Sequence, residues 1–80
     1  MPTKRLPARP NLEHLKYQAD DLRKGHKAGR LDVFQRLREF HPRFARASDA
    51  EIAAATLTLA DSQLTIAREY GFASWTRLRA

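Results

Sequence analysis

Apolar residues in this chain recur at intervals of three and four positions, which is the period of an α-helix. Within residues 12–26 the successive intervals are 3, 4, 3 and 4, and they define one helical stripe: Leu12, Leu15, Ala19, Leu22 and His26. A half-buried strand shows alternating apolar and polar residues. Here such alternation, as at residues 57–59, is too short to form a strand. The pattern predicts an all-α fold.

The first helix has a start signal and a stop signal. Asn11 stands where an N-cap side chain can accept a hydrogen bond from a free backbone N–H. Gly29 suits the position after the helix end, whereas Gly25 lies inside the pattern and costs about 1 kcal/mol relative to Ala. We therefore expect a helix that stops before Gly29 and whose last turn frays or ends early.

A second helix is expected between residues 30–32 and Phe40. Asp32 can cap its start or complement the helix dipole, and Pro42 disfavours helical geometry at His41. Its inward side chains are predicted to be Val33, Phe34 and Leu37, and the connector that follows is expected to fold Phe44 back onto the core.

Two further start signals follow. Ser48 and Glu51 match a capping box, so a helical turn should begin there and be anchored by Ile52. Thr58 and Asp61 form a weaker cap of the same spacing, which favours a new helix after Thr58. A single long helix over residues 49–70 is the alternative.

The C-terminal segment is predicted to form a corner. Gly71 suits the left-handed position after a helix, Phe72 supplies the accompanying apolar contact, and Ser74 can cap a last turn. In the helix before this corner the predicted inward face is Ala60, Leu64 and Ala67, flanked by Leu57, Ile66 and Tyr70. In the last turn Trp75 and Leu78 share one face.

These signals predict a small, compact bundle of four to five short helices in one domain, residues 11–80. Residues 1–10, with three of the four prolines, should form an extended basic arm. The first two helices are expected to form an αα-hairpin with the helix after Thr58 laid across them. The predicted core is Leu12, Leu15, Leu22, Phe34, Leu37, Ile52, Leu64, Ala67, Phe72, Trp75 and Leu78.

The chain carries a net charge of +6, and most of the excess lies in residues 1–30. A basic surface favours anionic partners, although charge of this size also serves solubility. The 80 residues contain no cysteine, which excludes disulfides and thiolate chemistry, and no run approaches the ~18 apolar residues of a membrane span. We expect a cytoplasmic protein without a membrane partner.

No motif for catalysis or metal binding is present. His14, His26 and His41 lack the close spacing of metal ligands, and the three glycines are too far apart for a phosphate loop. Asp20 and Asp21 stand at ion-pair spacing from the basic residues that follow them, as on a solvated helix face. The sequence therefore predicts no enzyme, no cofactor and no metal.

The C-terminal corner also permits a helix-turn-helix that binds nucleic acid. Gln63, Ala67 and Gly71 have the spacing of that motif, with a small residue where two helices approach and a glycine at the turn. The final helix would be only two turns long, and its Trp75 points more simply to a lid over the core. The anion or nucleic-acid contacts of this alternative are Lys4, Arg5, Arg9, Lys16, Arg77 and Arg79.

The runs RPNLEHLKYQA and ADSQLTIAREYGFASW are the most specific parts of a wider likeness that spans nearly the whole chain. The chain resembles the helical N-terminal region that precedes the repeats of many bacterial ankyrin-repeat proteins. In that family the repeats, about 33 residues each, supply a protein-binding surface. No repeat signature occurs in these 80 residues. The resemblance implies a helical fold and no catalytic residues, so a non-enzymatic protein-interaction or accessory module is the leading prediction.

Overall fold

The computed structural model describes residues 12–79, which form helices and contain no strand. The all-α prediction is therefore confirmed, and none of the described helices is long and apolar enough to cross a membrane. The predicted arm and the Asn11 cap lie outside the described residues. In chain order the elements are α1 (Leu12–Lys27), α2 (Leu31–Phe40), the 3-10 helix η1 (Pro42–Phe44), α3 (Asp49–Ala54), α4 (Leu59–Glu69) and α5 (Trp75–Arg79).

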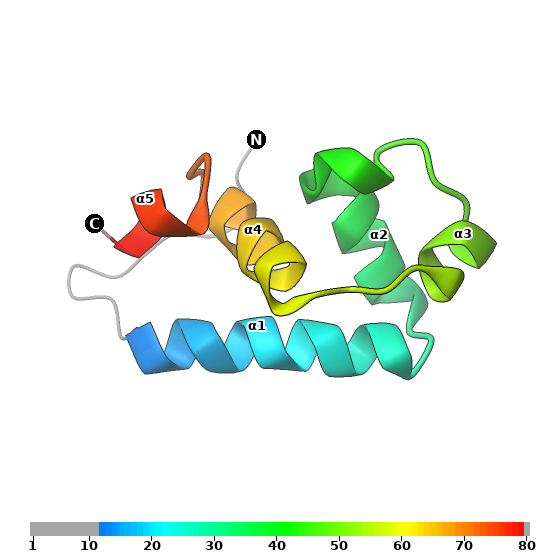
Figure 1. Cartoon of the computed structure of the whole chain (residues 1–80), viewed down its shortest axis with the longest axis horizontal. Helices are drawn as coiled ribbons and strands as arrows, with labels where there is room; N and C mark the ends of the chain where they lie inside the picture. The colour runs from blue at the N-terminus through cyan, green and yellow to red at the C-terminus, as the bar shows by residue number, and fades with distance from the viewer. Residues whose placement is uncertain (1–11, 80) are drawn as a thin grey trace.

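Helix α4 packs against three of the other helices. It packs most extensively against α1 and also contacts α2 and α5. These contacts agree with the prediction that this helix lies across the first two helices. Figure 1 shows α2 rising steeply from the end of α1 instead of lying alongside it. The predicted αα-hairpin is corrected on this point, because the apolar stripe of α1 is covered chiefly by α4.

Glycine ends two of the helices as predicted. Gly29 has a φ of 75° and Gly71 a φ of 89°, the left-handed geometry that glycine adopts without steric cost. After α1 the Gly29 N–H donates to His26 and the Arg30 N–H to Gly25. After α4 the Gly71 N–H donates to the Arg68 carbonyl, and the N–H of the next residue donates to Ala67. Both ends are Schellman motifs, which satisfy the last carbonyls of each helix.

Side-chain caps begin the later helices. Ser48 with Glu51, and Thr58 with Asp61, form complete capping boxes, so the predicted break between residues 54 and 59 is confirmed. The Ser74 hydroxyl accepts from the Arg77 N–H and caps α5. Helix α2 differs, since its N-cap is Arg30 without a side-chain cap and Asp32 lies in its first turn.

Gly25 does not end α1, which continues to Lys27. A Cβ atom at Gly25 would stand 2.6 Å from Cγ2 of Val33 on α2. The glycine is therefore needed where the two helices meet, because Val33 is a stiff β-branched residue that cannot easily move aside. This contact corrects the expectation of a frayed last turn.

The core contains most of the predicted residues. Leu12, Phe72 and Trp75 are only partly buried but pack against it, whereas Leu64 is half-buried and lies outside the cluster. The fully buried apolar residues are Leu15, Ala19, Leu22, Val33, Phe34, Leu37, Phe44, Ile52, Leu57, Ile66, Ala67 and Leu78.

The predicted inward face of α4 is correct at Ala67, which is buried, but wrong at Ala60 and Leu64. Ala60 is exposed, and two polar residues, Ser62 and Thr65, are fully buried beside Ile66. Their burial is tolerated because each hydroxyl donates to a carbonyl of its own helix, Ser62 to Leu59 and Thr65 to Asp61.

Candidate interaction surfaces

The residues predicted to contact anions are distributed over separate parts of the chain. Lys4, Arg5 and Arg9 lie outside the described residues. Lys16 is exposed on α1, whereas Arg77 and Arg79 are exposed together on α5. The described structure gives none of these last three side chains a hydrogen bond or an ion pair. They remain available to a ligand, but no single described element carries them all.

The structure places the helix-turn-helix residues as a corner. Ala67 is buried and Gly71 makes the turn between α4 and α5. Helix α5 has only 5 residues, and its Leu78 is buried in the core. A recognition helix needs a longer outward face, since the average helix has about 11–12 residues.

An ion pair between α2 and α4 has a buried carboxylate. The Arg36 guanidinium donates from Nε and Nη2 to the two carboxylate oxygens of Glu69, at 2.7 and 2.6 Å. Glu69 is 2% exposed, and its hydrogen bonds raise the pKa of Arg36 above its ordinary value despite partial burial. This bidentate geometry fixes the two helices relative to each other.

Asp61 connects a second group of polar residues. Its carboxylate accepts from the Thr58 N–H at 3.0 Å, lies 3.0 Å from Nε2 of His41 and contacts Arg43 at 3.4 Å. Burial raises the pKa of Asp61, but the hydrogen bonds from Thr58 and His41 outweigh that effect and hold it below its ordinary value. His41 Nδ1 accepts a hydrogen bond from the Arg43 N–H in η1. One ring nitrogen of His41 therefore contacts η1 and the other contacts α4.

Two of the three histidines, His26 and His41, are buried at structural positions. His26 is buried, with Nε2 2.7 Å from the Ile52 carbonyl and its ring edge-on to Phe34. His14 is exposed on α1. Within residues 12–79 no group of three or more His, Cys, Asp or Glu side chains is placed to hold a metal ion.

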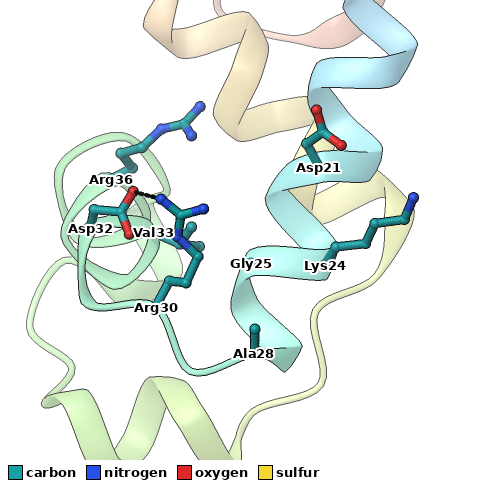
Figure 2. A pocket seen from close by; sticks show the side chains of 8 residues that line it. All are labelled: Asp21, Lys24, Gly25, Ala28, Arg30, Asp32, Val33 and Arg36. Atoms are coloured by element: carbon teal, nitrogen blue, oxygen red, sulfur yellow. Dashed lines mark hydrogen bonds and ion pairs between the residues drawn. The ribbon is translucent and has the colours of Figure 1, made fainter.

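A groove of about 370 Å³ lies between the end of α1 and the start of α2 (Figure 2). Its charges are of both signs: Arg30 donates to Asp32 at 3.1 Å, and Arg36 belongs to the ion pair described above. Asp21 and Lys24 stand on the α1 side. Lys24 pairs with Asp20 at 3.1 Å, which confirms the predicted solvated helix face. Because these charges largely neutralise one another, the groove has no strong preference for an ion of either sign.

Helix α1 exposes an aromatic residue, Tyr17, that was not predicted as a contact residue. Tyr17 is 68% exposed and, with Glu13 and Lys16, lines a shallow hollow of about 270 Å³. Tyr17 lies off the apolar stripe of α1, and a large aromatic residue on the polar face of a helix was the available signal. Leu31 and Leu59 are the other large apolar side chains that the described surface exposes.

Comparison with known proteins found no match to this chain among protein-family models, curated proteins or solved structures. The likeness to the region that precedes ankyrin repeats therefore stays a prediction.

Replacing Arg36 by Met should destabilise the fold by about 2–4 kcal/mol, because it removes the two hydrogen bonds that Arg36 donates to the buried Glu69 carboxylate. The partial exposure of Arg36 keeps the expected loss below that of a fully buried pair. Replacing both residues, Arg36→Met with Glu69→Leu, should recover most of the loss. Urea unfolding of the three proteins measures both effects. A double variant as unstable as Arg36→Met would show that the charge pair is not the cause.

Asp61 should make stability depend on pH. Its pKa is lower in the folded state than the unfolded value of about 3.9, so the unfolded chain binds more protons in that range. The stabilisation is present above about pH 4 and is lost as the pH falls towards the folded pKa. The difference in unfolding free energy between wild type and Asp61→Asn should therefore shrink on acidification, as urea titrations at about pH 7, 4 and 3 would show. The exposed Asp21→Asn variant is the control, and a difference that stays constant with pH would contradict the assignment.

Proposed function

We propose that this chain is a non-enzymatic helical module that binds another protein. The observation that carries the proposal is Tyr17, which is 68% exposed beside Lys16 and Glu13. Tyrosine is enriched among the residues that dominate protein interfaces, since it buries a rigid apolar ring and keeps a polar tip. His41 is 6% exposed, and its ring nitrogens contact Asp61 on α4 and the Arg43 N–H in η1, which favours a structural role for this His–Asp contact.

The placement of this module in a larger protein rests on the resemblance to the N-terminal region of bacterial ankyrin-repeat proteins. A helical domain with both termini of α4 firmly capped suits a role as a rigid accessory unit beside a binding surface. A cytoplasmic location accords with a chain that needs no disulfide. Reading the gene beyond the codon for Ala80 tests the link to repeats.

Tyr17→Ser should weaken capture of the partner by at least about tenfold, because a tyrosine at the centre of an interface contributes about 2 kcal/mol or more. Affinity capture followed by mass spectrometry would compare four baits: wild type, Tyr17→Ser, Leu31→Ser as a second exposed apolar residue, and Ile52→Asp as a misfolded control. Recovery of one discrete partner by wild type and Leu31→Ser supports the proposal. Recovery of the same proteins by all four baits would contradict it.

Nucleic-acid binding is the second candidate, and it is favoured by the exposed Arg77 and Arg79, which have no counter-charge in the described structure. The exposed Lys16 and the basic residues Lys4, Arg5 and Arg9 would extend this contact.

If DNA or RNA binds, the logarithm of the affinity should fall linearly with that of the salt concentration, with a slope of about 0.7–0.9 per phosphate contact. Arg77→Gln with Arg79→Gln should lower the slope by about 1–2. Fluorescence anisotropy with labelled duplex and single-stranded DNA provides the measurement, and Glu39→Gln is an exposed control. Absence of binding at low salt would eliminate this candidate.

A further inference from the structure

A second cavity, of about 400 Å³, lies between the C-terminal half of α1 and the segment that leads from α3 to α4. Its α1 wall is basic and consists of Arg23, His26 and Lys27. Its opposite wall consists of small and apolar residues, Ala53, Ala55, Thr56 and Leu57. No carboxylate lines this cavity, in contrast to the groove of Figure 2, where acidic and basic side chains alternate.

Arg23 carries a buried hydrogen-bond donor without an acceptor. Its Nε is covered by the protein and has no partner. The other half-buried arginines of the described chain differ, since Arg36 donates to Glu69 and Arg38 donates to the Ala47 carbonyl and to Asp49. An unmet buried donor is costly, and more so when it is charged. Because Arg23 also lines the cavity, a rotation of its side chain would bring this donor to an acceptor from outside the chain.

Lys27 adds a second positive charge to the same wall. It is exposed, and no described carboxylate pairs with it. The negative end of the α1 dipole accounts for cations in the last turn, but Arg23 lies before that turn. His26 holds the two walls together, because its Nε2 donates to the Ile52 carbonyl at 2.7 Å. The cavity thus has a fixed frame and two unpaired cationic groups.

We propose that this cavity binds an oxyanion, namely the phosphate or carboxylate group of an organic ligand. A rotation of the Arg23 side chain would present its Nε–H and Nη–H groups as the fork that receives two oxygens of one anion. Lys27 would contribute charge, and the apolar part of the ligand would lie against Ala53, Ala55 and Leu57. The site is independent of the Tyr17 surface and does not require a protein partner.

Nuclear magnetic resonance titration of the full ¹⁵N-labelled chain tests this proposal. The probes are inorganic phosphate, phenyl phosphate and benzoate, added at constant ionic strength. We expect a saturable shift of the Arg23 Nε–H resonance together with the backbone amides of residues 53–57. If none of the three probes produces such a shift, the proposal is wrong.

Two variants separate the site from general charge attraction. Arg23→Gln should weaken the binding of the preferred probe by about tenfold or more, since a hydrogen bond to a charged group is lost. Arg77→Gln removes the same charge on α5, at the opposite end of α1 in Figure 1, and should leave the affinity unchanged. Equal weakening by both variants would overturn the proposal.

A third variant tests the cavity without changing any charge. Ala53→Leu places a larger side chain at the lining residue Ala53, which is exposed on α3, and should block the ligand while the fold persists. Unchanged affinity in this variant would place the anion elsewhere.

The three probes also distinguish the source of the oxyanion. Stronger binding of phenyl phosphate identifies a phosphorylated ligand, and stronger binding of benzoate identifies a carboxylate; either result supports the site. Equal affinities for inorganic phosphate and phenyl phosphate would show that the phenyl ring makes no contact with the apolar wall. That result would overturn this part of the proposal.

Discussion

The way α2 packs against α4 depends on how the buried Glu69 carboxylate is satisfied. A carboxylate that is 2% exposed is tolerated only with strong hydrogen bonds, and Arg36 supplies two of them from the neighbouring helix. Apolar packing restricts how α2 and α4 meet, and the Arg36–Glu69 pair adds a directional contact between them. The bidentate pair is therefore compatible with few placements of α2 on α4, and α4 in turn covers the apolar stripe of α1.

Placing α4 at the centre has a consequence for its composition. A helix that faces α1, α2 and α5 must bury more of its circumference than a surface helix does. Ser62 and Thr65 fill part of that wide face, since their small side chains satisfy their own hydroxyl groups within the helix. This explains why the hydrophobic pattern predicted the inward face of α4 only in part, whereas it predicted those of α1 and α2 correctly.

The sequence predicts the ends of the helices better than their contacts, because capping is a local property. Ser48, Thr58, Gly29 and Gly71 each satisfy backbone groups within four residues of themselves, and the structure has all four as predicted. The ion pair of Arg36 joins residues 33 positions apart in the sequence. In the sequence alone, Arg36 and Glu69 look like ordinary charged residues of exposed helix faces, so the pair could not be predicted. The clash that requires Gly25 likewise exists only once α2 is in place.

The same distinction bears on the candidate sites. Net charge suggests an anionic partner but does not say which cations are free to bind one. Arg36, Arg38 and Arg43 contact carboxylates that stabilise helix ends and junctions, so their charges are already compensated. Lys16, Arg77 and Arg79 have no such contact but stand on open surface, where an isolated charge is well solvated and attracts anions only weakly. Arg23 differs from both groups, because its uncompensated donor is covered by the protein and gains more from an acceptor than a solvated cation does. Burial, rather than the total charge of +6, therefore decides where this domain has the most to gain from binding an anion.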